Sequence, residues 1–124
     1  MVKKKIIAFD LDETLCFRTK KLSTVERYNY CEPINKNIDI CNKCYDEGFY
    51  IKIYTARGIN TFNGNVELIY KKLYKFTKEQ LIKWNVKHHE LIMGKQEYDL
   101  LIDDKAVNIK YIQSYLDIKK HLDA

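Results

Sequence analysis

Side chains that could do chemistry follow four short apolar segments of this sequence. In chain order they are Asp10 with Asp12, Thr55, Lys95, and Asp103 with Asp104. The carboxyl ends of parallel strands share one edge of a sheet, and ligands bind beyond that edge. Two carboxylates at i and i+2, such as Asp10 and Asp12, can face the same side of an extended backbone. We therefore predict that these acids, the hydroxyl and the ammonium converge on one functional site.

The apolar segments themselves predict the strands that position these residues. Lys4–Phe9 and Tyr50–Thr55 have the length and composition of buried strands, and Leu91–Met93 and Leu100–Ile102 are two shorter candidates. Helical patterns separate them, and strands that alternate with helices pair in parallel through right-handed crossovers. The predicted fold is α/β, a three-layer sandwich with a mainly parallel central sheet.

Four helices are expected between and after the strands. The first covers about residues 33–47, and the second carries the apolar stripe from Val66 to Tyr74. A capping-box pattern of Thr77 and Gln80 predicts the start of a third helix. The last is expected to place these residues on one face: Val107, Tyr111, Tyr115 and Ile118.

Residues 1–124 are predicted to form a single domain. Two stretches show neither the helical nor the strand spacing of apolar residues: Cys16–Cys31 and Gly58–Asn65. Both are candidate active-site loops. The segment 16–31 is long enough for a flap but too short for a separate cap domain. The predicted site is therefore open.

Charge and hydropathy narrow the classes of partner. The net charge of +5 suits an anionic substrate, yet the basic residues are spread along the chain, so nucleic acid is an unlikely partner. No apolar stretch approaches the roughly 20 residues of a membrane helix, and the N-terminus lacks the apolar region of a signal peptide. We expect a soluble cytoplasmic protein with no membrane partner, and a homo-oligomer remains open.

Cys41 and Cys44 have the C-x-x-C spacing of some zinc and redox sites. No second C-x-x-C or spaced histidine pair completes such a site. Helical spacing with Ile34, Ile38 and Tyr45 instead favours two buried thiols on an apolar helix face. The role of the two cysteines stays open.

The motifs together resemble the haloacid dehalogenase (HAD) superfamily of phosphatases. The run Asp10-Leu11-Asp12-Glu13-Thr14 resembles its first motif, Thr55 its second, Lys95 its third and Asp103-Asp104 its fourth. Four further stretches resemble the small capsular polysaccharide biosynthesis phosphatases within it: residues 31–34, 53–58, 77–81 and 103–108. Gln96 departs from the pattern, because many relatives have proline after the lysine.

The resemblance implies a capless HAD-like, Rossmannoid fold and a Mg²⁺-dependent phosphomonoester hydrolase. Asp10 would be the nucleophile that forms an aspartyl-phosphate, and Asp12 the general acid and base. Thr55 and the backbone amide of Ala56 would hold phosphoryl oxygens, while Lys95 offsets negative charge.

The resemblance also implies the magnesium ligands and the class of substrate. The ligands would be Asp10, the backbone carbonyl of Asp12 and Asp103, with Asp104 supporting them. The expected substrate is a phosphorylated carbohydrate or nucleotide-sugar. Candidate substrate contacts at the mouth of the site are Arg57, Lys20, Lys21 and Tyr28.

Three other functions fit parts of the pattern. A receiver-like signalling domain uses similar residues, but its phosphoacceptor aspartate would lie on a middle strand, where this chain has Thr55. Phosphoprotein phosphatases that act on the RNA polymerase tail share the first motif and are usually longer. A degenerate binding module would lack catalytic groups, and none is missing here.

Overall fold

A computed structural model describes residues 3–123 of the 124-residue chain. Its main sheet has three parallel strands in the order β1-β4-β5: β1 (Ile6–Asp10), β4 (Tyr50–Tyr54) and β5 (Glu90–Ile92). Asp10 pairs with Tyr54, and Tyr54 pairs with Ile92, so the three strands end side by side. The predicted α/β class and the first three predicted strands are confirmed. Three layers remain a prediction.

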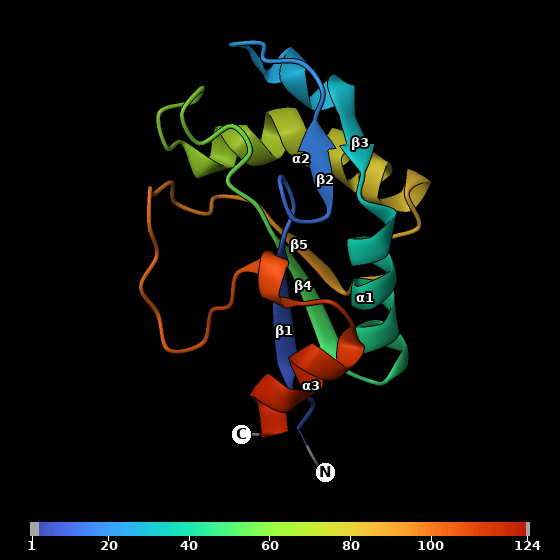
Figure 1. The fold of residues 1–124 in the computed structure, drawn as a ribbon. Helices are drawn as coiled ribbons and strands as arrows, with labels where there is room; N and C mark the ends of the chain where they lie inside the picture. Colours follow the sequence, from blue (N-terminus) through green and yellow to red (C-terminus); the bar gives the residue numbers. More distant parts are fainter. Residues whose placement is uncertain (1–2, 124) are drawn as a thin grey trace.

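The part of the chain that the structure describes contains three α-helices: α1 (Asn35–Asp46), α2 (Val66–Lys83) and α3 (Tyr115–Asp123). In Figure 1, α1 and α3 lie beside the lower part of the sheet, whereas α2 crosses near its upper end. Gly48, with a φ of 96°, lets the chain turn after α1 and enter β4. Within residues 3–123, no helix is both long and apolar enough to cross a membrane.

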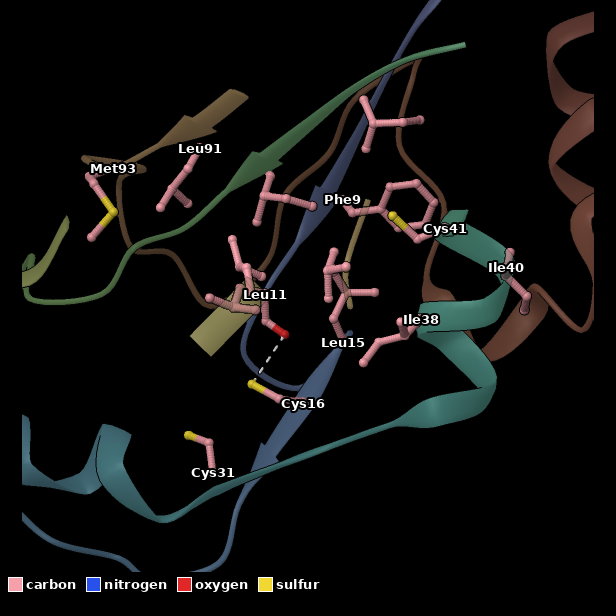
Figure 2. Packing of buried hydrophobic residues seen from close by; sticks show 14 of the residues in the cluster. Phe9, Leu11, Leu15, Cys16, Cys31, Ile38, Ile40, Cys41, Leu91 and Met93 are labelled. Carbon is pink, nitrogen blue, oxygen red and sulfur yellow. Dashed lines mark hydrogen bonds between the residues drawn. The ribbon is translucent and has the colours of Figure 1, made fainter. Parts of the chain in front are cut away.

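The apolar core lies between the sheet and the helices. Ile51 and Ile53 of β4 are fully buried, as are Leu11 and Leu15 after β1. Figure 2 shows Phe9 beside Cys41 and Leu15 beside Ile38 of α1, with Leu91 and Met93 farther across the sheet. This core holds the carboxyl end of β1 against that of β4, where the polar residues begin.

The segment 16–31 contains more order than a loop. β2 (Cys16–Arg18) pairs antiparallel with β3 (Cys31–Pro33), and the 3₁₀ helix η1 (Val25–Tyr30) lies between them. These elements form a small hairpin above the ends of β1 and β4 in Figure 1. We call residues 16–33 the flap.

The prediction of a helix start at Thr77 was wrong. α2 is one continuous helix whose N-cap is Asn65, and the Asn65 side chain accepts a hydrogen bond from the Leu68 amide at 3.1 Å. Thr77 and Gln80 are buried inside α2 and face Arg57. The same residue types that cap a helix can also satisfy a buried guanidinium, and here tertiary contacts decide which they do.

The prediction of a fourth strand at Leu100–Ile102 was also wrong. Leu100 and Ile102 are 76% and 88% exposed, and the chain from residue 96 to 108 forms an exposed loop (orange in Figure 1). Three apolar residues carry little strand signal of their own and need a paired neighbour. Among the described residues, β1 pairs only with β4 in the main sheet.

The predicted final helix is shorter and later than expected. Val107 precedes the 3₁₀ helix η2 (Ile109–Tyr111), and α3 begins only at Tyr115. Val107 and Tyr111 are exposed, whereas Ile118 is buried. The chain leaves helical geometry at residues 112–114, so the expected common face does not form.

Candidate functional site

The carboxyl end of β1 supplies the two aspartates of the first motif. Asp10 ends the strand and accepts a hydrogen bond from the Leu11 amide at 2.9 Å. A tight turn follows, in which Glu13 has a φ of 66° and the Leu15 amide bonds to the Leu11 carbonyl. This turn brings Asp12 back to the end of the sheet, and both carboxylates line one pocket.

Asp12 is held by a buried arginine from the end of β4. Arg57 Nε lies 2.9 Å from Asp12 Oδ2, and Arg57 Nη2 lies 3.0 Å from Oδ1, a two-pronged ion pair. Arg57 is 1% exposed. Its Nη1 also donates to Gln80 at 2.6 Å and to Thr77 at 3.4 Å.

Arg57 therefore lies on the inner wall of the pocket rather than at the surface of its mouth. The Asp12 carboxylate balances the charge of Arg57, so the main structural role of Arg57 is to position that carboxylate. Its place in Thr55-Ala56-Arg57-Gly58, directly after a buried strand, was a signal that it is an inner residue. Tyr28 is also buried, whereas Lys20 and Lys21 are exposed on the flap.

Thr55 and Lys95 meet at the same end of the sheet. Thr55 is 1% exposed, and its Oγ1 accepts from the Arg57 amide at 3.2 Å. The Lys95 amide donates to the Thr55 carbonyl at 3.1 Å, which fixes the lysine next to β4. Lys95 Nζ then lies 3.6 Å from Asp10 Oδ2. Asp10, Asp12, Thr55 and Lys95, four of the residues predicted to converge, thus lie together at this edge.

The local electrostatics follow from this packing. Burial raises the pKa of Asp10 above its usual value, and the Lys95 ammonium only partly offsets that effect. For Lys95, burial acts to lower the pKa, but Tyr98 and Asp10 together outweigh it and the pKa is raised. Lys95 is therefore a fixed cation beside the carboxylate.

A pocket of about 190 Å³ lies between the end of the sheet and the flap. The sheet side contributes Asp10, Asp12, Thr55, Ala56 and Arg57, and the flap side contributes Arg18, Arg27 and Tyr28. Ile59, Asn60 and Glu97 complete the rim and also border a wider, more open hollow. Such a pocket has room for a compact charged group and opens toward solvent.

Asp103 and Asp104 are not brought to this pocket. They follow the exposed segment that did not form a strand, and the Asp103 carboxylate accepts from the Lys105 amide at 3.1 Å. The acid pair Asp103-Asp104 is therefore absent from the group of predicted site residues that lie together at the pocket. A role for Asp103 as a metal ligand stays a prediction.

The sequence analysis did not predict that two thiols, those of Cys16 and Cys31, lie beside Asp12. The ligand atoms of Asp12, Cys16 and Cys31 all lie within 4.8 Å of one another, and Figure 2 shows the two thiols facing across the flap. Arg57 Nη2 lies 3.8 Å from Cys16 Sγ and 3.7 Å from Cys31 Sγ, so a cation already occupies the centre of this cluster. The Cys16 thiol and this guanidinium lower the pKa of Cys31.

Cys41 and Cys44 lie elsewhere, on the buried face of α1. Burial raises the pKa of Cys41 to about 12 and that of Cys44 to about 11. Both thiols thus behave as apolar core groups, as their helical spacing favoured.

The donor set at the end of β1 fits a hard cation. Mg²⁺ prefers oxygen ligands and usually keeps several waters, so it needs few protein groups. Asp10 offers a carboxylate that is 39% exposed in its side chain and faces the pocket. The sulfur-containing cluster suits Mg²⁺ less, because two of its three donors are soft.

No family model and no curated protein matches the chain. One solved structure is similar throughout: an MCSG target from Vibrio cholerae, known from its crystal structure. It is 28% identical to this chain, with a TM-score of 0.78, and the alignment covers 96% of this chain and 97% of the other. The two proteins share a fold along nearly their whole length.

Proposed function

We propose that this protein is a Mg²⁺-dependent phosphomonoesterase that acts through an aspartyl-phosphate on Asp10. The observation that carries the proposal is that Asp10, Asp12 and buried Thr55 line one pocket, with Asp12 held by Arg57 and the Lys95 ammonium 3.6 Å from Asp10. A carboxylate nucleophile, a fixed cation, a hydroxyl and a second carboxylate are the groups that such a reaction needs.

In the first step, an Asp10 oxygen forms a bond to phosphorus while the bond to the leaving oxygen breaks. Lys95 and Thr55 stabilise the phosphoryl oxygens, together with the backbone amide of Ala56. Bound Mg²⁺ would neutralise charge between the Asp10 carboxylate and the phosphate dianion. Asp10 supplies its side-chain ligand here, and Asp103 is proposed as a further ligand that must approach from the exposed loop.

Asp12 is proposed to transfer the protons. It protonates the leaving alkoxide and then takes a proton from the water that attacks the phosphoryl group, which releases phosphate and restores Asp10. Both Asp12 oxygens accept from Arg57, which suits the carboxylate form used in the water step. For the first step, one of these oxygens must exchange its Arg57 contact for a proton.

The proposed substrates are phosphomonoesters of sugars or nucleotide-sugars. The pocket is polar and open, and the flap of residues 16–33 leaves its rim exposed. An open site can accept a phosphate carried on a large leaving group. We expect a higher kcat/KM for such compounds than for glycerol phosphate, and consistently better hydrolysis of small phosphates would argue for a closed site.

The decisive test is phosphate release from p-nitrophenyl phosphate with and without Mg²⁺, followed by a screen of sugar phosphates, nucleotide-sugars and phosphopeptides. Steady Mg²⁺-dependent turnover supports the proposal. A single phosphorylation event without turnover would favour the receiver-like alternative. Turnover confined to phosphopeptides would favour the phosphoprotein phosphatase.

A further inference from the structure

Two arginines of the pocket pack on the same aromatic ring. The guanidinium carbon of Arg27 lies 4.5 Å from the centre of the Tyr28 ring, and that of Arg57 lies 4.7 Å from it. The Tyr28 hydroxyl accepts from Arg27 Nη2 at 2.8 Å and from the Gly58 amide at 3.0 Å. Tyr28 thus fixes both cations on the walls of one pocket.

The two arginines differ in how their charges are balanced. Arg57 has the Asp12 carboxylate, Gln80 and Thr77 as partners. Arg27 donates to the Thr24 carbonyl at 2.9 Å and to Tyr28, both neutral groups, and its buried Nε has no partner. Within residues 3–123, Arg27 forms no ion pair: every ion pair within 4.0 Å is made by a different lysine or arginine.

A partly buried guanidinium without a carboxylate is unusual, because desolvated charges are normally paired. Arg27 is also held in place by stacking and by two hydrogen bonds, so an incoming anion need not order it. The groups that would hold a reacting phosphate lie at the end of the sheet: Thr55 and the Ala56 amide in the pocket lining, and Lys95 beside Asp10. Arg27 lies on the flap side and remains available for a second anionic group.

We propose that Arg27 forms a second anion subsite, and that the preferred substrates carry a carboxylate or a further phosphate besides the phosphate that is removed. This inference rests on the proposed phosphatase function for its account of the other subsite. Arg18, which also lines the flap side, is less suited because it pairs with Glu13 at 3.8 Å and is largely exposed.

The test compares two hexose-derived phosphates, only one of which carries a second anionic group. Glucose 6-phosphate and 6-phosphogluconate share the reacting phosphate, but only the second has a carboxylate. We expect the wild-type protein to prefer 6-phosphogluconate, and Arg27→Gln to reduce kcat/KM for it by about tenfold or more, as for a charge-assisted hydrogen bond. The same variant should change kcat/KM for glucose 6-phosphate by less than about threefold.

Lys75→Gln is the matched control, since it removes one positive charge from the exposed surface of α2, outside the pocket lining. It should leave the preference unchanged. Arg27→Lys should retain part of the preference, because it keeps the charge and loses the planar fork. Thermal melts of each variant check that the flap substitutions leave the fold intact.

Equal losses for both substrates in Arg27→Gln, or no wild-type preference for the carboxylate, would overturn the subsite. Calorimetric titration of Asp10→Asn protein with the same two compounds gives a reading that needs no turnover. Binding that favours 6-phosphogluconate and depends on Arg27, without any hydrolysis by wild type, would uphold the subsite and reject the phosphatase. Hydrolysis without selectivity would do the reverse.

Discussion

The end of β4 and the segment after Lys95 were both expected to deliver chemistry to one edge of the sheet, and only the first does so. Residues 55–57 leave β4 directly into buried contacts with Asp12, Gln80 and Thr77. Residues 100–104 contain an equally apolar run and an acid pair, yet remain exposed. Both regions have the composition of a strand followed by functional residues.

The difference lies in the partners that each region finds. Ile51 and Ile53 of β4 are fully buried, with a strand on each side, so the residues that follow have a fixed starting point. Leu100–Ile102 has no paired strand to fix Asp103 in the described structure. In these two regions, a motif residue is therefore positioned by the pairing of its strand rather than by its own motif.

The largest effect is expected at the nucleophile. Asp10→Asn should fold and lose at least about 10³-fold in kcat, because the amide cannot form the covalent intermediate. Steady-state hydrolysis of p-nitrophenyl phosphate measures the loss, and a thermal melt verifies folding. Substantial turnover in a preparation free of wild-type enzyme would remove Asp10 from this role.

Asp103→Ala tests whether the exposed acid enters the site when metal binds. We expect the Mg²⁺ concentration for half-maximal activity to rise about tenfold or more, or activity to be lost. Without metal, the free energy of unfolding should change by less than about 0.5 kcal/mol, because Asp103 is exposed. Unchanged Mg²⁺ activation would exclude Asp103 as a ligand.

Arg57→Met tests the buried region through stability. The substitution leaves Asp12 and Gln80 without their partner in a largely buried site, which should cost about 3 kcal/mol in urea unfolding. The control is Arg18→Met, whose ion pair with Glu13 is exposed and should contribute less than about 1 kcal/mol. Similar costs for both variants would contradict the positioning role of Arg57.

Gly58→Ala probes the turn that follows Arg57. Gly58 has a φ of +80°, and a Cβ there would lie 2.6 Å from a methyl carbon of Leu73. Gly48→Ala is the matched control, with a φ of +96° and open space around it. Both substitutions should lower the free energy of unfolding by about 1 kcal/mol, because alanine is strained at a positive φ. Gly58→Ala should lower it by about 1–2 kcal/mol more, because its Cβ crowds Leu73. Equal unfolding free energies would show that the turn is not tightly packed.

The smallest effect is expected at His88, away from the site. Burial lowers the pKa of His88, and its ring accepts from Lys78 while donating to the Val86 carbonyl. The folded protein thus favours the neutral ring. This contribution is complete above about pH 6.5, the unfolded value, and is lost as the pH falls below it toward the folded pKa. Urea midpoints of His88→Gln should therefore fall less on acidification than those of wild type.

Much of the fold could be predicted from local sequence. The strand after Lys5 and the strand from Tyr50 were predictable because each is a mainly apolar run of strand length. The helix α1 was predictable because its apolar spacing, early proline and Gly48 agree. The shared edge of Asp10, Thr55 and Lys95 followed from the rule that parallel strands end together. These features depend on short-range pattern and chain order.

Other features depended on contacts between distant residues, which the sequence does not encode locally. Thr77 and Gln80 are partners of a buried arginine, and Cys16 and Cys31 lie beside Asp12. Arg27 contacts Tyr28, and within residues 3–123 it forms no ion pair within 4.0 Å. The order of strands, helices and motif residues along the chain determined an α/β fold in which acidic, basic and hydroxyl side chains lie at the carboxyl edge of the sheet. The tertiary structure decided which charges are neutralised inside the protein and which remain for a ligand, because desolvation and pairing arise only when the elements pack together.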